Sequence, residues 1–150
     1  MNNNATQILR ILAIDYPDAK TALKHENALE MLISTILSAQ CTDERVNIVT
    51  QSLFKKYKPP EDYVNIDIKA LEQDVRSTGF YKNKAKNIKN CCKMILEVYH
   101  GKIPDTLNEL VKLPGVGRKT ANVVLGAVFN KIEGIAVYTH VRRLSYRLGL

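Results

Sequence analysis

A glycine-rich turn followed by a basic pair is the part of this sequence best suited to chemistry. Residues 114–120 read Pro-Gly-Val-Gly-Arg-Lys-Thr, and apolar segments flank them up to Leu113 and from Ala121. Gly115 and Gly117 allow positive φ and the close approach of another backbone. The N–H groups that begin the second helix can then bind an anion, and phosphate suits the positive potential there. A tight turn without a ligand is the alternative.

Two other phosphate-binding motifs do not fit these residues. A P-loop requires glycine directly before the Lys-Thr pair and another five residues earlier, but these positions hold Arg118 and Leu113. A dinucleotide fingerprint requires a preceding strand and a third glycine, and Thr120 occupies that place. The pattern therefore predicts a helix–hairpin–helix over 106–129, which binds a DNA backbone without reading its sequence.

The charge distribution favours the same kind of partner. The net charge is +7, but residues 1–75 carry 8 basic and 11 acidic side chains (net −3), and residues 76–150 carry 14 and 4 (net +10). A basic half indicates a polyanionic binding partner, and nucleic acid is favoured over a membrane surface. The alternative is a basic surface that is merely solvated. An apolar content of 45% excludes wholesale disorder, and no apolar run is long enough to span a bilayer.

The elements that must position the motif are predicted to be helical almost throughout. Apolar residues recur at helical spacing, and the segment 135–137 is β-prone but too short for a sheet. We therefore expect an all-α fold of about eight helices, over 8–16, 28–39, 43–58, 67–77, 83–99, 105–113, 118–128 and from Thr139 onward. Asp43 is expected to cap the third of these.

The cysteines predict neither disulfides nor a metal site. Cys41, Cys91 and Cys92 are odd in number, and two are adjacent. With no signal-peptide pattern in Met1–Asn4, free thiols in a reducing cytoplasm are expected.

Several stretches resemble the endonuclease III family, DNA glycosylases and AP lyases of the helix–hairpin–helix superfamily. The likeness is strongest over 113–124 and 135–141. Residues 37–43 resemble the family's DNA-intercalating loop, and 79–85 its second loop.

The resemblance implies an all-α fold of two lobes with a DNA groove between them. Residues 1–25 are expected to form an N-terminal helix of the second lobe, and 26–133 a six-helix barrel domain. Residues 134–150 would return into the second lobe, which would be incomplete because the family's C-terminal cluster region is absent. One extra residue is expected in the loop at 130–134.

By resemblance, Lys119 is the catalytic nucleophile. It would attack C1′ of an extruded damaged nucleotide, expel the base and form a Schiff base, after which β-elimination nicks the strand. The attacking amine must be neutral, which a helix N-terminus and desolvation both favour. A phosphate contact, like that expected of Arg118, is the alternative.

Tyr138 stands where the family has a catalytic aspartate. Tyrosine is neutral at pH 7 and brings no charge to the developing cation on the sugar. One charge pair at about 4 Å is worth roughly 4 kcal/mol at an effective dielectric of about 20. Its loss corresponds to a rate about 10³-fold lower. We therefore expect impaired activity; altered chemistry is the alternative.

The resemblance also assigns DNA contacts. Gln40 would fill the space left by the extruded base, and Phe80 would wedge the opposite strand unless it faces inward. The remaining DNA-binding positions are Leu113, Gly115, Val116, Gly117, Arg118, Thr120 and His140. Lysines 82, 84, 86, 89 and 93 form a basic run, either a solvated face or a phosphate-binding one.

The expected function is base-excision repair of oxidised pyrimidines in double-stranded DNA by a monomer in the cytoplasm, at the nucleoid, without membrane contact. Many relatives hold a 4Fe–4S cluster through four cysteines beyond residue 150, which the cysteines of this chain do not match, so no cofactor is expected. A non-catalytic protein that recognises abasic or damaged DNA is the alternative. A helix-turn-helix regulator is a weaker one.

Overall fold

The structure, a computed structural model, describes residues 3–150, and these are helices joined by loops with no strand among them. The all-α prediction is confirmed. The elements are α1 (Asn3–Asp15), α2 (Ala28–Leu37), α3 (Asp43–Lys56), α4 (Pro60–Asn65), α5 (Ile68–Asp74), the 3₁₀ helix η1 (Arg76–Thr78), α6 (Tyr81–Tyr99), α7 (Leu107–Leu110), α8 (Arg118–Phe129) and α9 (Thr139–Arg147).

The described chain forms two compact units. The larger contains 22–136, and the smaller combines the described part of 1–21 with Val137–Leu150. Within residues 3–150, no helix has both the length and the apolar character needed to cross a membrane.

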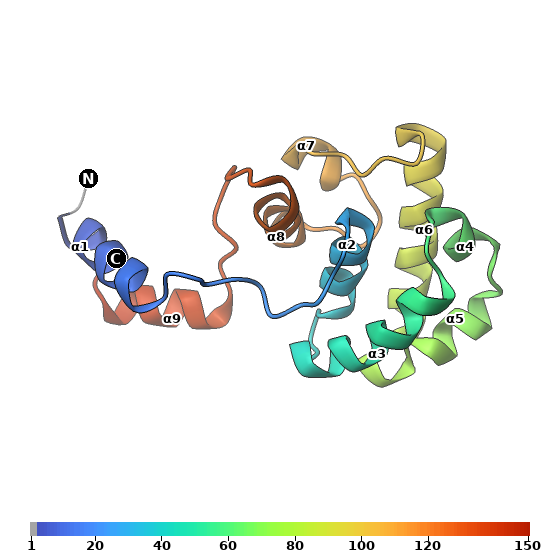
Figure 1. The fold of residues 1–150 in the computed structure, drawn as a ribbon, viewed down its shortest axis with the longest axis horizontal. Coiled ribbons are helices and arrows are strands. Elements are labelled where there is room, and N and C mark those ends of the chain that lie inside the picture. Colours follow the sequence, from blue (N-terminus) through green and yellow to red (C-terminus); the bar gives the residue numbers. More distant parts are fainter. Residues whose placement is uncertain (1–2) are drawn as a thin grey trace. The chain divides into compact units, whose positions relative to one another are not determined.

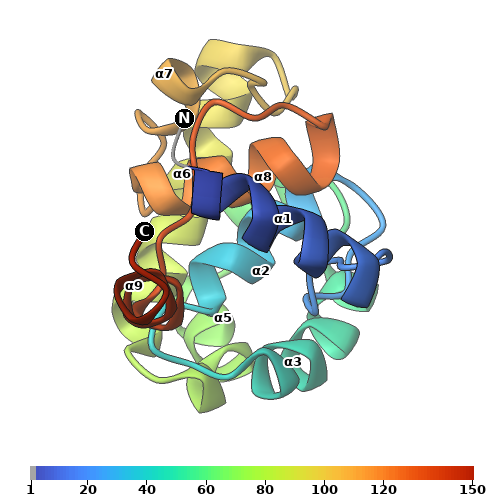
Figure 2. The same ribbon diagram turned by 90° about the vertical axis from the view of Figure 1, so that its left-hand side faces the viewer.

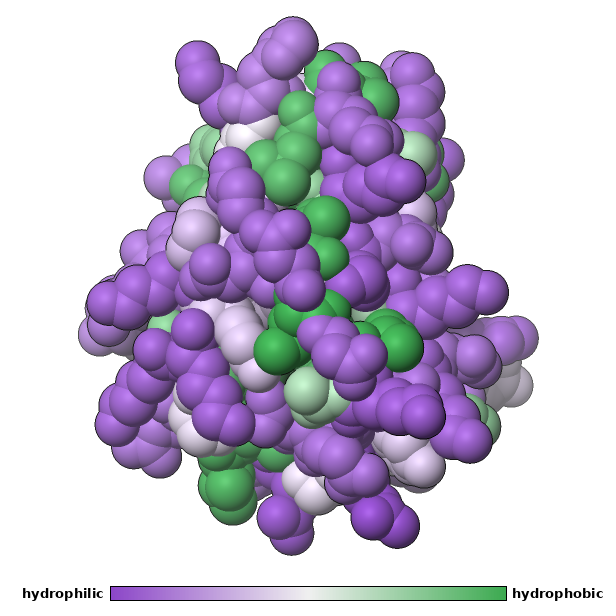
Figure 3. Space-filling model, turned by 90° about the vertical axis from the view of Figure 1, so that its right-hand side faces the viewer, coloured by the Kyte–Doolittle hydropathy of each residue, from purple (hydrophilic) through white to green (hydrophobic). Residues whose placement is uncertain are grey.

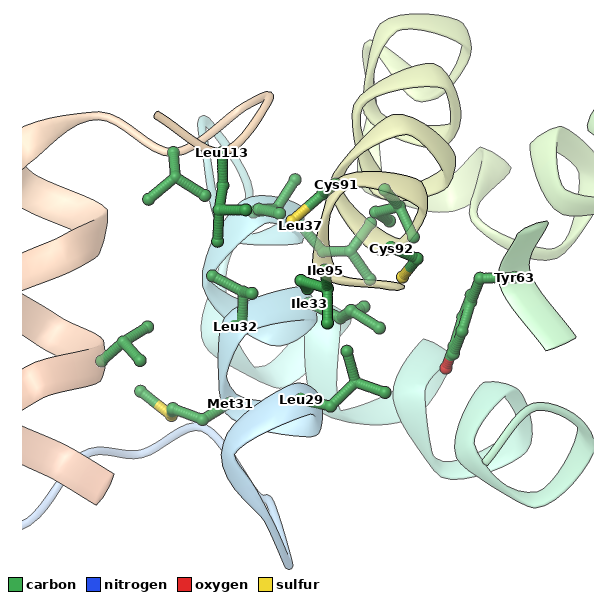
Figure 4. Packing of buried hydrophobic residues seen from close by; sticks show 14 of the residues in the cluster. Leu29, Met31, Leu32, Ile33, Leu37, Tyr63, Cys91, Cys92, Ile95 and Leu113 are labelled. Atoms are coloured by element: carbon green, nitrogen blue, oxygen red, sulfur yellow. The ribbon is translucent and has the colours of Figure 1, made fainter. Parts of the chain in front are cut away.

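Helix α2 forms the centre of the larger unit. It is apolar on nearly every side, as expected of a helix surrounded by protein, and it packs against α3, α6 and α8. Figures 1 and 2 show α2 enclosed by these helices. Ile33 and Leu37 of α2 lie near Ile95 and Cys91 of α6 in the core (Figure 4).

The long helix α6 links the parts of this unit. Its buried face includes Ala85, Ile88, Cys92 and Ile95, and α4 and α5 pack on it. The surface on this side of the unit is mostly hydrophilic, with a narrow, interrupted band of apolar residues (Figure 3). The apolar residues of α6 thus face the core, and most of its charged side chains lie near solvent.

Several boundaries differ from the predicted ones. Helix α4 was not among the predicted helices, since the sequence shows Pro59 and Pro60 directly after the predicted helix 43–58. Pro60 in fact occupies the first turn of α4, where its missing N–H is tolerated. The predicted helix over 67–77 is divided into α5 and η1. Thr42, not Asp43, caps α3 by accepting from the Arg45 N–H at 3.3 Å.

The smaller unit contains α1 and α9. Both helices leave large apolar side chains exposed, among them Leu9, Ile11, Ile14, Leu144 and Tyr146. None of the side chains of α9 is buried.

Candidate nucleic-acid interface

The predicted hairpin between α7 and α8 is present and is anchored in the core. The Val116 N–H donates to the Leu113 carbonyl at 3.0 Å and closes the turn. Both side chains are buried, and Figure 4 shows Leu113 in the core near Leu37 of α2. Leu113 and Val116 can therefore contact a ligand through their backbone atoms but not through their side chains.

The two hairpin glycines serve different purposes. Gly115 has φ +79°, and a Cβ there would lie 2.8 Å from the Cβ of Asn87 on α6. Gly117 has φ −85°, which any residue can adopt, so the expectation of positive φ is right for Gly115 and wrong for Gly117. A Cβ on Gly117 would meet nothing within 4 Å, which leaves open space in front of α8.

The N-terminus of α8 gathers donors and cations in one place. Gly117 is the N-cap, and no side chain caps the helix. The first N–H groups of a helix have no intrahelical acceptor. Arg118 and Lys119 are exposed here, and Thr120 is half-buried. This end of α8 can hold an anion with an amine beside it.

Asn122, three residues after Lys119, was not identified from the sequence. Its Oδ1 is buried and has no hydrogen-bond partner among the described residues. The backbone at Gly134 lies close to its amide, since a Cβ there would be 2.9 Å from Asn122 Nδ2. The available signal was an asparagine within an otherwise apolar helical stretch, where such residues usually bond locally or face solvent.

Gln40 and Phe80 share an unusual backbone conformation. Gln40 lies between α2 and α3 with φ +53°, and Phe80 precedes α6 with φ +47°. This left-handed region is unfavourable for residues with a Cβ and persists only where the surroundings impose it. Both side chains are exposed, Phe80 by 66%, so the inward-facing alternative for Phe80 is wrong. The two loops therefore present an amide and an aromatic ring to solvent.

The basic run on α6 is only partly available to a ligand. Lys84 is 5% exposed and Lys89 is half-buried, and each ammonium donates to two backbone carbonyls at 2.5–2.7 Å. The interpretation of all five lysines as one solvated or phosphate-binding face is wrong for these two. Lys82, Lys86 and Lys93 are exposed.

Tyr138 and His140 belong to the smaller unit, whereas Lys119 belongs to the larger. Tyr138 is the N-cap of α9, 41% exposed, and provides no side-chain cap. Aspartate is among the preferred N-cap residues because its carboxylate accepts from the first helical N–H groups. His140 is exposed, with its Nδ1 3.2 Å from Nη2 of Arg143.

The cysteines do not fit the ligands of an iron–sulfur cluster. Cys91 and Cys92 are buried in the core, and burial raises the pKa of the Cys91 thiol to about 12 and raises that of Cys92 as well. Metal ligation requires thiolates. Within residues 3–150, no three His, Cys, Asp or Glu side chains are grouped to hold a metal ion.

Comparison with known proteins places these features in a family context. Residues 33–150 match the model of the HhH-GPD superfamily of base excision DNA repair proteins. Endonuclease III of Bacillus subtilis is 54% identical over 135 residues, which are 90% of this chain and 61% of that protein. Endonuclease III of a Synechocystis species is 50% identical over 97% of this chain and 67% of that protein. The chain thus spans about two thirds of the length of these relatives.

Solved structures show the same likeness. A non-covalent endonuclease III–DNA complex matches with a TM-score of 0.92 and 50% identity, covering 99% of this chain and 70% of that one. A trapped covalent endonuclease III–DNA intermediate with an estranged adenine matches with a TM-score of 0.91 at the same identity.

Proposed function

The chain belongs to the endonuclease III family of helix–hairpin–helix base excision repair proteins, and on that premise we propose that it is a DNA glycosylase with AP lyase activity. The observation that carries the proposal is the N-terminus of α8, where uncapped backbone donors, Arg118 and Lys119 lie together. The hairpin binds DNA phosphates through its backbone, which explains the open space at Gly117.

Lys119 is the nucleophile in this proposal. Its Nζ attacks C1′ of the extruded nucleotide, the glycosidic bond breaks, and the base departs with the bonding electrons. The attached amine then loses a proton, the C1′–O4′ bond opens with protonation of O4′, and the resulting Schiff base makes a C2′ proton acidic. Loss of that proton expels the 3′ phosphate by β-elimination and nicks the strand. Position and chemistry agree, because an exposed amine beside a phosphate site can reach the sugar.

Damage recognition falls to the two loops of the larger unit. Extrusion of a nucleotide leaves a space in the duplex, which Gln40 fills from one side while Phe80 wedges the opposite strand. Their exposed side chains and imposed backbone conformation support these roles. We further propose oxidised pyrimidines and abasic sites as substrates and a monomer at the nucleoid. We propose no cofactor held by this chain's cysteines.

Tyr138 limits base removal in this proposal. Removal of a base builds positive charge on the sugar, and a carboxylate would stabilise that charge where a neutral ring does not. An abasic site already offers an aldehyde, so its attack by Lys119 needs less charge stabilisation. Slow nicking of abasic DNA should therefore remain, while release of oxidised pyrimidines is nearly lost.

Single-turnover assays on both substrates, with borohydride trapping on abasic DNA, test this function. A covalent adduct that is absent from Lys119→Ala supports the enzyme. The Tyr138→Asp variant should recover both steps. Binding of abasic DNA with no trapped adduct in either the native or the Tyr138→Asp protein would favour the alternative, a non-catalytic DNA-binding protein.

A further inference from the structure

One buried ammonium contacts the ends of the two helices that lead into the loops of Gln40 and Phe80. The Nζ of Lys84 donates to the Leu37 carbonyl at 2.7 Å and to the Thr78 carbonyl at 2.7 Å. Leu37 ends α2, three residues before Gln40, and Thr78 ends η1, two residues before Phe80. The two carbonyl contacts join segments that lie 47 and 6 residues from Lys84 in sequence.

The backbone ties Lys84 to the second loop as well. Its own N–H donates to the Phe80 carbonyl at 3.1 Å in the first turn of α6. The Leu37 carbonyl belongs to the last turn of α2, where carbonyls have no intrahelical partner and carry negative partial charge. A cation at this point satisfies that carbonyl and attracts both chain segments.

Stability alone does not explain a charge at this position. An ammonium loses hydration when it is buried, and apolar replacements of buried ions are often neutral or stabilising. The pKa of Lys84 is lowered because burial disfavours the ammonium, although the charge–charge interaction with Cys41 opposes this effect. Cys41 itself directly follows Gln40.

We propose that Lys84 is a positioning residue that fixes Gln40 and Phe80 relative to each other, so that both enter the duplex at one damaged site. The proposal rests on the function proposed above. Lys84 touches neither DNA nor the reacting atoms. It acts by holding the ends of α2 and η1 together beneath the two exposed side chains.

Removing the ammonium should release both loops. Lys84→Met leaves the Leu37 and Thr78 carbonyls buried without a donor, and unpaired buried carbonyls are unfavourable enough that the segments should move toward water. Lys89 provides a matched control, because it lies on the same helix and donates to the carbonyls of Val64 and Ile66. Lys89→Met therefore makes the same change of charge and hydrogen bonding away from the loops.

The first measurement is amide hydrogen exchange in the free protein. Lys84→Met should accelerate exchange at both 38–41 and 78–81, whereas Lys89→Met should not. Lys84→Gln, which keeps two N–H donors, replaces the methionine variant if that variant does not fold. Unchanged exchange in either loop would refute the proposal that Lys84 holds the two loops together, independently of how the protein binds DNA.

The second measurement is the ratio of affinities for duplex with an abasic analogue and for intact duplex, with 2-aminopurine opposite the analogue to report unstacking. We expect Lys84→Met to lower this ratio about tenfold, the factor associated with one lost stacking contact. The 2-aminopurine signal should fall together with this affinity ratio. Lys84→Arg should restore part of the ratio and of the signal, and Lys89→Met should change neither quantity.

Equal losses in Lys84→Met and Lys89→Met would indicate a general structural effect and overturn the proposal. A native protein without preference for abasic DNA would refute the proposed function, and hydrogen exchange would still decide whether Lys84 joins the loops.

Discussion

Replacing Gly115 by alanine places a methyl group where the hairpin has no space for it. The new Cβ would lie 2.8 Å from Asn87 Cβ and 3.1 Å from Asn87 Cγ, and the residue would still need φ near +79°. A left-handed conformation is unfavourable by about 1–2 kcal/mol for a residue with a Cβ. Overpacking adds about 1–3 kcal/mol. The free energy of unfolding should therefore fall by about 2–5 kcal/mol, a large part of the total for a domain.

Urea unfolding followed by circular dichroism measures this loss. With a slope of about 2 kcal/mol per molar, the midpoint should fall by at least about 1 M. Gly117→Ala is the control, because its φ of −85° is ordinary and its Cβ would meet nothing within 4 Å, so its midpoint should hardly move. Adding Asn87→Gly to Gly115→Ala should recover the steric part. Equal midpoints for the two alanine variants would refute the reasoning.

Gly117→Ala, although stable, should weaken binding to intact duplex in a fluorescence anisotropy titration, because its methyl group occupies the space proposed for a phosphate. The ion pair with Lys131 lowers the pKa of Asp105, so this ion pair should stabilise the fold at neutral pH and cease to do so as the pH falls below the ordinary aspartate range. The difference in urea midpoint between the native protein and Asp105→Asn should therefore shrink on acidification. A difference that stays constant would contradict this prediction. A thiol reagent at pH 8 should modify the half-buried Cys41 of the folded protein before it modifies the buried Cys91, whose pKa is raised to about 12. Mass spectrometry of the labelled peptides measures the order of modification, and earlier labelling of Cys91 would contradict the prediction.

Most of the helices could be predicted because their sequence signals are local. Apolar spacing placed α2, α6 and α8 within a few residues of their bounds, and Pro-Gly-Val-Gly identified the hairpin. The family likeness followed from the order of the same motifs. The short helix α4 was harder to predict, because it begins at Pro60, a residue type that more often follows the end of a helix.

Other features depended on tertiary contacts that no local pattern contains. Gly115 requires glycine because Asn87 of α6 packs against it, whereas Gly117, two residues away, has open space. The sequence by itself determined an all-α chain with a basic half and a glycine-rich hairpin that follows Leu113. Only the tertiary structure decided which lysines of α6 reach solvent, because the acceptors of Lys84 lie on α2 and η1 and its burial arises when those segments pack together.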